Sequence, residues 1–291
     1  LEDIFFGNSK YKDAKLYFQT ENGFELAESS VLESLNKPEQ IFAEISDYNN
    51  DGKFDLLVGN AGGEFYGRAK ALTDQLFIQS DTTLLEMTLP EYYQHTSVIL
   101  KDDKDCPTLY GFGHAVSNDF GKRPDAYIYK NDCKNFQSVE SELLKNYGMV
   151  TDAIWFDIDA DGQSEIITVG EWMPPRVLKV DGENIEDISV EFIPENLHGL
   201  WQSITTFDLD NDGQKEIILG NFGQNTKFKA SKEAPLRLYY ADFDDNGQTE
   251  SMVCLNRNGK YYPINTFDEL AQQMPMLKKK FNAYKDFAGQ P

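Results

Sequence analysis

Four segments of the chain repeat one spacing of oxygen-bearing side chains. Each segment fits the pattern D-x-[DN]-x-[DN]-G-x-x-[DE], so positions one, three, five and nine offer a carboxylate or amide oxygen, and position six is glycine. Position seven can add its backbone carbonyl. The candidate metal ligands are Asp47, Asn49, Asp51, Lys53 and Asp55 in the first loop, Asp157, Asp159, Asp161, Gln163 and Glu165 in the second, Asp208, Asp210, Asp212, Gln214 and Glu216 in the third, and Asp242, Asp244, Asn246, Gln248 and Glu250 in the fourth.

This set of donors suits calcium, which takes about six to eight oxygen ligands at roughly 2.3–2.6 Å. Alternate residues of a tight loop can converge on one point, and glycine at position six permits the sharp turn. Without a cation, the clustered carboxylates of each loop would repel one another at close range. We therefore expect about four structural Ca²⁺ ions, one in each loop. The alternative is a set of acidic surface turns that bind no metal.

The residues that follow the loops predict β-strands. Short runs rich in Leu, Ile and Val that end in glycine occur at 56–59, 166–170 and 217–220, and such runs are typical of strands. An EF-hand loop closes at its twelfth position and leads into a helix. The four loops close at position nine, and we therefore reject an EF-hand.

The loops recur with a period of about 50 residues. The first three begin at Asp47, Asp157 and Asp208, so another copy is expected near 101–106, where the ligand pattern is lost. A second element recurs at a similar step, and turn residues after three of its four copies predict hairpins. Its copies are 16–19, 76–79, 127–130 and 177–180. Four strands in each unit of this length are typical of a β-propeller blade.

We therefore predict an all-β fold, a single incomplete β-propeller of four-stranded blades that spans residues 1–291. The approximate blades are 1–45, 46–99, 100–156, 157–207 and 208–291. The fourth loop breaks the period, and the strand-like run before it predicts a place between the third and fourth strands of the last blade. Asp3 matches Asp55 in its following residues, which predicts a ninth loop position there and further blades on both sides.

A short helical insertion is predicted at 266–287. Thr266 and Glu269 have the spacing of a capping box, and apolar residues follow on one helical face. Pro275 should kink or split the helix near Met274. The apolar positions are Leu270, Met274, Leu277, Phe281 and Tyr284. We expect this segment to pack on the propeller, with binding of a partner as the alternative.

The loops followed by an apolar run, glycine and asparagine resemble the FG-GAP/VCBS repeats of the integrin α-subunit propeller. Further residues are similar to bacterial VCBS-repeat proteins of the Bacteroidetes type, related to the ASPIC/UnbV and cartilage acidic protein group. These residues are Gly148–Asp152, Trp155, Glu171–Pro174, Gly199–Ile204, Gly220–Asn221, Ala230–Ser231, Tyr262–Pro263 and Asp268–Leu270. The resemblance implies a seven-bladed, integrin-like propeller at the cell surface, with calcium in the blade loops. No literal Gly-Ala-Pro follows any loop, which is a departure from the family pattern.

The charge of the chain argues against two classes of partner. The 49 Asp and Glu residues exceed the 27 Lys and Arg residues, giving a net charge of −22, whereas nucleic acids and anionic membranes require clustered basic residues. No apolar run approaches the roughly 20 residues that a membrane helix needs. The three cysteines fit no metal or redox motif. Cys106 and Cys133 either pair in an oxidising compartment or remain buried thiols.

Aromatic residues form the remaining candidates for a binding surface. Trp155, Trp172 and Trp201 either stack on sugar rings or fill the space between blades, and the two prolines after Met173 predict a loop around Trp172. The three histidines form no known catalytic motif, so no enzymatic activity is expected.

The sequence thus predicts an extracellular, calcium-binding module for adhesion or recognition at the bacterial cell surface or outer membrane. Its expected partner is a protein or polysaccharide, without nucleic acid binding or direct membrane insertion. The calcium is expected to be structural, because each loop can surround its ion with protein oxygens. One alternative is a scaffold or auxiliary module of a polysaccharide-processing enzyme. Another is a scaffold for assembly, which a large buried interface would favour.

Overall fold

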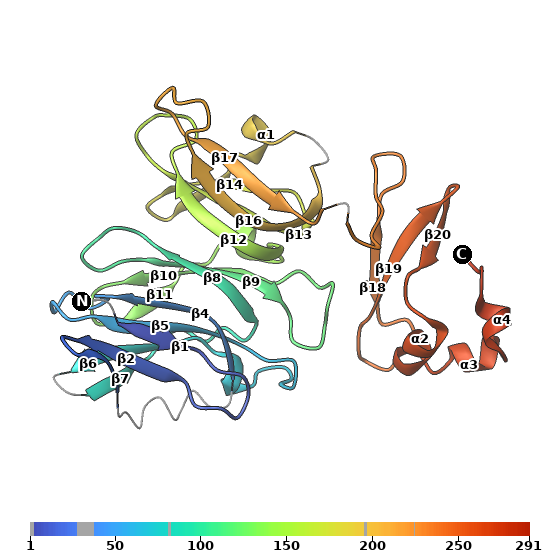
Figure 1. The fold of residues 1–291 in the computed structure, drawn as a ribbon, viewed down its shortest axis with the longest axis horizontal. Coiled ribbons are helices and arrows are strands. Elements are labelled where there is room, and N and C mark those ends of the chain that lie inside the picture. Colours follow the sequence, from blue (N-terminus) through green and yellow to red (C-terminus); the bar gives the residue numbers. More distant parts are fainter. Residues whose placement is uncertain (1–2, 28–37, 81–82, 195–196, 224) are drawn as a thin grey trace. The chain divides into compact units, whose positions relative to one another are not determined.

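The computed structural model describes residues 3–27, 38–80, 83–194, 197–223 and 225–291, and the remaining parts of the predicted blades lie outside the described residues. Antiparallel strands form most of the regular structure, which confirms the predicted β class (Figure 1). The chain divides into two compact units. The first comprises residues 1–117 and 123–220, and the second comprises residues 118–122 and 221–291. Among the described residues, no helix has the length and apolar character needed to cross a membrane.

The first unit contains a series of antiparallel sheets in which strands adjacent in sequence are paired. The first sheet consists of β1 (Ile4–Phe6), β2 (Lys15–Thr20) and β3 (Gly23–Leu26). The second consists of β4 (Glu39–Ser46), β5 (Asp55–Ala61), β6 (Gln75–Ser80) and β7 (Thr83–Met87). The third consists of β8 (His95–Lys101), β9 (Leu109–Ala115), β10 (Ala126–Asn131) and β11 (Phe136–Ser138).

The fourth sheet has the same hairpin order, with an extension. Its strands are β12 (Met149–Phe156), β13 (Glu165–Met173), β14 (Arg176–Asp181) and β15 (Asn184–Asp187), and β16 (Gly199–Phe207) and β17 (Glu216–Asn221) extend it. The start of β16 pairs with the end of β13, where the register shifts between Glu171 and Met173. Trp172 lies at this irregularity with φ of 59°. The prediction that Trp172 lies in a loop after the strand was therefore wrong, because β13 continues through it as an irregular strand end.

The core lies between consecutive sheets, which explains the long apolar runs. Every residue of β5 is buried, and side chains alternate between the two faces of a strand. Leu57 joins a cluster that includes Ile99 of β8, whereas Leu56 joins a cluster that includes Leu16 of β2. A strand covered on both faces needs apolar residues at successive positions. Each fully buried side chain of this size contributes roughly 1.5–3 kcal/mol.

A buried polar network lies within this core at the end of β5. Oδ1 of Asp74 accepts a hydrogen bond from the backbone N–H of Asn60 (3.1 Å). Oδ2 of Asp74 accepts hydrogen bonds from the hydroxyls of Thr96 and Tyr127, both at 2.7 Å. Burial raises the pKa of Asp74 to about 6, and these three hydrogen bonds oppose the rise. The network satisfies polar groups that would otherwise be costly to bury.

The segment predicted to be a degenerate repeat forms the connection between β8 and β9. It joins the first two strands of its sheet, as the first loop joins β4 to β5 and the second joins β12 to β13. Here the loop contains Cys106, which forms a disulfide with Cys133 in the turn after β10. A covalent bond therefore ties down the one connection of this series that lacks the ligand pattern, and Cys254 is buried and free.

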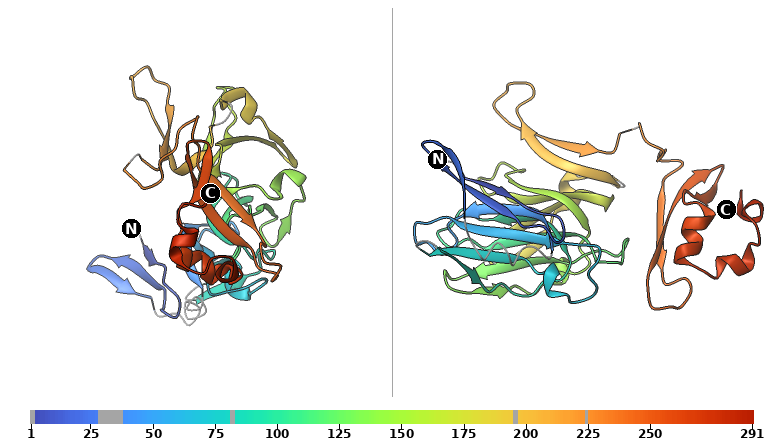
Figure 2. Two further views of the ribbon diagram at one scale, coloured as in Figure 1. Left: turned by 90° about the vertical axis from the view of Figure 1, so that its right-hand side faces the viewer. Right: turned by 60° about the horizontal axis from the view of Figure 1, so that its bottom comes forward.

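The second unit contains a three-stranded sheet and short helices. Its strands are β18 (Arg237–Ala241), β19 (Glu250–Arg257) and β20 (Lys260–Pro263), in that order. Its helices are α2 (Phe267–Gln273), α3 (Leu277–Lys280) and α4 (Tyr284–Phe287), which lie beside the sheet (Figure 2). The fourth loop joins the first two strands of this sheet, so its predicted place between the third and fourth strands of a blade was wrong. β17 and β18 belong to different sheets.

The helical segment follows the sequence pattern in its first part, whereas Tyr284 of the predicted apolar face is 54% exposed. The Thr266 side chain accepts the N–H of Glu269, and the Glu269 side chain accepts the N–H of Thr266. Helix α2 ends at Gln273, with Met274 as its C-cap residue, and the predicted break before Pro275 is confirmed, because proline lacks an N–H and clashes with the preceding turn. Leu270 and Met274 are buried, with 1% and 4% of their surface exposed.

Candidate metal centres

The four predicted loops share one backbone conformation. The glycines at position six, Gly52, Gly162, Gly213 and Gly247, have φ between 85° and 91°. Position four also has positive φ in every loop, at Asn50, Ala160, Asn211 and Asp245, with values of 57–62°. Asparagine and aspartate tolerate this left-handed conformation better than most residues, whereas alanine does not. The spacing of the pattern is thus matched by a common turn geometry.

Backbone N–H groups orient the carboxylates in a common way, which the second loop illustrates. Oδ1 of Asp157 accepts the N–H of Asp161 (3.1 Å), and Oδ2 accepts the N–H of Gly162 (2.9 Å). Oδ1 of Asp159 also accepts the N–H of Asp161 (3.0 Å), and Oδ1 of Asp161 accepts the N–H of Gln163 (2.8 Å). The first and third loops repeat these four contacts. The fourth repeats those made by its first and fifth positions.

In three loops, carboxylates at positions one, three and nine converge. Each triad has one ligand oxygen per residue, and these oxygens lie within 4.8 Å of one another. The triads are Asp157, Asp159 and Glu165 in the second loop, Asp208, Asp210 and Glu216 in the third, and Asp242, Asp244 and Glu250 in the fourth. Each triad could hold a metal ion, and positions five and seven lie in the same turn.

The ninth residue links the loop to the strand that follows. Oε2 of Glu165 accepts the N–H of Ile158 (3.2 Å), and the corresponding glutamates of the third and fourth loops make the same contact. Oε1 of Glu165 is buried without a hydrogen-bond partner in the described part of the chain, and so is Oδ1 of Asp244. A buried carboxylate oxygen without a partner is costly. A metal ion is the partner that fits these two orphaned oxygens.

The first loop differs at its ninth residue, because Asp55 is one methylene shorter than glutamate. Oδ2 of Asp55 accepts the N–H of Tyr48 (2.8 Å), and Oδ1 accepts the N–H of Gln79 (2.9 Å). Both oxygens are therefore engaged by backbone. Asp3 makes the same contact as Oδ1 of Asp55, through the N–H of Gln19 (2.9 Å). In addition, the Asn49 amide donates to Oδ2 of Asp51 (3.1 Å), so the first loop offers fewer uncommitted oxygens than the others.

Lys179 contacts the second loop, and the sequence pattern did not predict this contact. Its Nζ lies 2.8 Å from Oδ2 of Asp161, 3.7 Å from Oδ2 of Asp159 and 4.0 Å from Oε1 of Glu165. Lys179 comes from β14, which pairs with β13 in a register that matches Leu178 to Ile166. The signal was therefore present only in the cross-strand register.

Local charges shift the pKa values within the second loop in opposite directions. Burial raises the pKa of Glu165, and the neighbouring charges of Asp159 and Asp161 add to this effect. The hydrogen bond from Lys179 lowers the pKa of Asp161, and its contact with Asp161 raises the pKa of Lys179. Carboxylates of like charge thus face one another, and one ammonium group offsets part of their repulsion.

The structure gives two tryptophans packing contacts. Nε1 of Trp155 donates to the carbonyl of Lys101 (3.0 Å), and its ring meets that of Tyr110 edge to face. Nε1 of Trp201 donates to the carbonyl of Leu197 (3.1 Å). Both rings pack against core clusters, which agrees with the packing alternative for these two residues.

Two of the three histidines lie away from any triad. His114 lies beside Glu171, with 3.6 Å between Nε2 and Oε2, and its hydrogen bond lowers the pKa of Glu171. Burial lowers the pKa of His95. Among the described residues, no histidine joins a cluster that could hold a metal.

The sequence was compared with models of protein families and with curated proteins. Neither comparison finds a match.

Proposed function

We propose that this chain is a calcium-binding β-propeller module that recognises a protein or polysaccharide partner outside the cell. The observation that carries the proposal is the repeated turn, in which three acidic triads converge and two buried carboxylate oxygens accept no hydrogen bond within the described part of the chain. An isolated acidic turn could be a solvated surface feature. A turn repeated with the same φ values and the same N–H contacts indicates selection for a bound cation.

The donor chemistry favours calcium over other metals. Carboxylate, amide and carbonyl oxygens are hard ligands, and calcium accepts six to eight of them in flexible geometry. Zinc and copper sites use histidine or cysteine, which are absent from all four loops. In the second loop, for example, Asp157, Asp159, Asp161 and Glu165 would hold the ion. The ion would neutralise the carboxylates and fix the turn.

The loops should differ in affinity. The second, third and fourth loops each supply a convergent triad, whereas Asp55 of the first loop has both oxygens bound by backbone N–H groups. We expect three stronger sites and a weaker first site. The expectation of about four structural ions is thus kept, with unequal affinities.

The propeller assignment is supported by the arrangement of the first unit. Consecutive antiparallel sheets pack against each other through shared core clusters, and the first and second loops connect the first two strands of their sheets. Repetition of this kind is typical of propellers, in which the same connection of each blade lies on one rim. The resemblance to FG-GAP/VCBS repeats is consistent with this assignment.

An extracellular location is supported by the disulfide between Cys106 and Cys133, because disulfides persist mainly in oxidising compartments. The role in recognition follows from rigidity. Calcium would hold each acidic turn in one conformation, so that the loops form a fixed surface for a partner.

Calorimetric titration of the chelator-stripped protein with Ca²⁺ tests this proposal, with Mg²⁺ as the control. We expect about three ions to bind tightly, a weak response to Mg²⁺, and a higher melting temperature with calcium. At a free concentration one hundred times the dissociation constant, each site adds about 2.7 kcal/mol to the free energy of unfolding. The absence of binding heat together with an unchanged melting temperature would show that the loops are plain acidic turns.

A further inference from the structure

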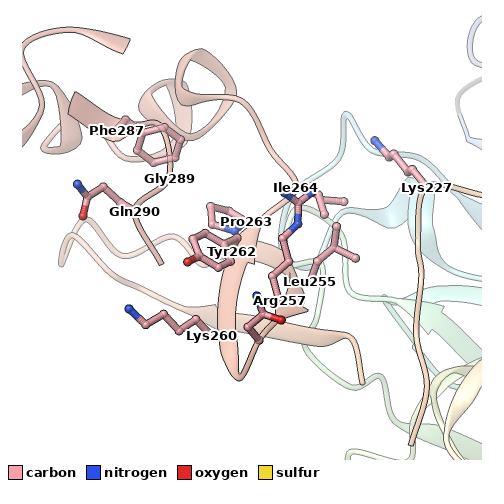
Figure 3. A pocket seen from close by; sticks show the side chains of 11 residues that line it. Lys227, Leu255, Arg257, Lys260, Tyr262, Pro263, Ile264, Phe287, Gly289 and Gln290 are labelled. Atoms are coloured by element: carbon pink, nitrogen blue, oxygen red, sulfur yellow. The ribbon is translucent and has the colours of Figure 1, made fainter. Parts of the chain in front are cut away.

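The second unit contains a pocket whose charge is opposite to that of the whole protein. The cavity has a volume of about 860 Å³ and lies between the β19–β20 hairpin and the segment that follows α4 (Figure 3). This size is within the range of small-molecule sites, roughly 300–1,000 Å³. Three basic residues, Lys227, Arg257 and Lys260, line it, and none of its described lining residues is acidic. The chain as a whole has a net charge of −22.

One face of the hairpin forms the floor of the pocket. Arg257 lies directly opposite Lys260, and Leu255 lies opposite Tyr262. Because alternate residues of a strand share a face, all four side chains project to the same side. Asn258 and Gly259, with φ of 53° and 81°, form the tight turn between the strands, as is usual for an Asn-Gly hairpin. The turn therefore fixes the two basic side chains side by side.

This cross-strand pair is a cost to the fold without a bound anion, because like charges directly opposite each other destabilise a sheet. Among the described residues, neither Arg257 nor Lys260 forms an ion pair. Lys227 is different, because its charge lies near Glu269. The capping hydrogen bonds between Glu269 and Thr266 lower the pKa of Glu269, and the charge of Lys227 lowers it further. The two hairpin residues are thus the centre of the uncompensated positive charge.

The rest of the lining fits a sugar ring. Tyr262 and Phe287 are half-buried aromatic residues, and aromatic faces can cover the apolar face of a pyranose. Asn258 and Gln290 add side-chain amides, which can donate to ring hydroxyls and accept from them. Figure 3 shows Phe287 and Gln290 on the segment that faces the hairpin bearing Tyr262 and Lys260.

We propose that this pocket binds an anionic saccharide, with its acidic group held by Arg257 and Lys260 and a ring against Tyr262. Arginine and lysine make strong, charge-assisted hydrogen bonds to carboxylates and sulfates. An anionic saccharide would be the polysaccharide partner of the proposed recognition module. The role of this binding in recognition rests on that proposed function, whereas the binding itself does not. The pocket residues are distinct from all calcium ligands.

The test is titration of the calcium-saturated protein with trigalacturonate, followed by NMR. Galactotriose is the matched neutral control, because it lacks the carboxylates at the same ring positions. Inorganic sulfate separates a simple anion site from a saccharide site. We expect trigalacturonate to bind and to shift the resonances of Lys260, Tyr262 and Gln290, with at least about tenfold weaker binding of both controls.

Two double variants give the matched comparison. Arg257→Gln with Lys260→Gln should weaken binding of trigalacturonate about tenfold or more. Lys278→Gln with Lys279→Gln removes the same charge from exposed positions of α3 and should leave the affinity unchanged. An equal loss in both variants would reduce the effect to general electrostatics and overturn the proposal. A thermal melt confirms folding of each variant, and the resonance map of the natural chain decides independently of them.

Two further results would overturn the proposal. One is equal binding of galactotriose, and the other is equal binding of inorganic sulfate. A protein that binds calcium but not trigalacturonate would contradict the pocket alone and leave the calcium sites intact. Binding of trigalacturonate without any binding of calcium would contradict the calcium proposal alone.

Discussion

Lys179 and Asp161 form an ion pair at the second loop, with 2.8 Å between Nζ and Oδ2. The ammonium group therefore lies among the same oxygens that would bind calcium. A calcium ion approaching Asp159 and Glu165 meets this positive charge, and like charges at such distances repel. Lys179 should thus weaken the second calcium site relative to the third and fourth.

Replacement of Lys179 by methionine should strengthen calcium binding at the second loop about threefold to tenfold. The substitution removes an ammonium group that competes with calcium, and the partial exposure of this group to solvent limits the gain. The amide resonance of Gly162 reports this site, since its N–H donates to Asp157. Lys179→Arg, which keeps the charge, should retain the natural affinity. An unchanged or weaker affinity in Lys179→Met would contradict the competing role.

The length of the ninth side chain should set the strength of each site. Asp55→Glu should raise the calcium affinity of the first loop by about tenfold, because a glutamate can contact the N–H of Tyr48 and still present a second oxygen. The reciprocal change Glu165→Asp should weaken the second loop. The resonances of Gly52 and Gly162 follow the two sites separately. The control is Asp55→Asn, which keeps the length of the side chain and removes its charge. Equal effects of Asp55→Glu and Asp55→Asn would exclude this explanation.

Ala160 should be a point of local strain in the second loop. Its φ is 59°, and the left-handed conformation costs roughly 1–2 kcal/mol for most L-residues. Asn50 and Asn211 occupy this position in the first and third loops. Ala160→Asn should therefore raise the free energy of unfolding by about 0.5–1 kcal/mol, as measured by denaturant unfolding in calcium. Ala160→Ser serves as the control, and a gain of the same size in Ala160→Ser would point to another cause.

Asp74 should make stability depend on pH in the opposite direction to a carboxylate whose pKa is lowered by folding. Its folded-state pKa is about 6, compared with an ordinary value of 3.8. Between these values the folded state binds more protons than the unfolded state. The contribution of Asp74 to the free energy of unfolding is thus largest below pH 4 and falls by up to about 3 kcal/mol as the pH rises through 6.

Asp74→Asn should remove this dependence, because the amide keeps an acceptor for the N–H of Asn60 and can donate to the hydroxyl of Thr96. The measurement is denaturant unfolding between pH 4 and pH 7, taken as the difference between the natural chain and the variant. Asp103→Asn, at an exposed position, is the control. Parallel pH profiles for the natural chain and Asp74→Asn would show that Asp74 does not titrate in this range.

Local sequence patterns predicted much of the hairpin structure. The runs after the first three loops form β5, β13 and β17, because a hairpin depends on residues that are close in sequence. The capping box at Thr266 and the break before Pro275 were predicted for the same reason. These features require only local hydrogen bonds and steric limits.

The remaining features depend on contacts between residues far apart in sequence. Lys179 reaches the second loop through the register of β14 on β13, and the oxygens of Asp55 are engaged partly by Gln79 of β6. The basic pocket requires the segment after α4 to face the β19–β20 hairpin. Trp172 was misplaced because its irregular strand end depends on pairing with β16. Such pairings cannot be read from the spacing of residues along one segment.

The most direct test of the central claim is a site-resolved NMR titration of the chelator-stripped protein with Ca²⁺ and, separately, with Mg²⁺. Each loop has its own reporter, because the glycine at position six donates to the first aspartate of that loop. We predict that the resonances of Gly213 and Gly247 shift and saturate first with Ca²⁺, that Gly162 and Gly52 follow at higher concentration, and that Mg²⁺ has little effect. If the four glycine resonances remain unchanged with Ca²⁺, or respond equally to Mg²⁺, the loops are not calcium sites.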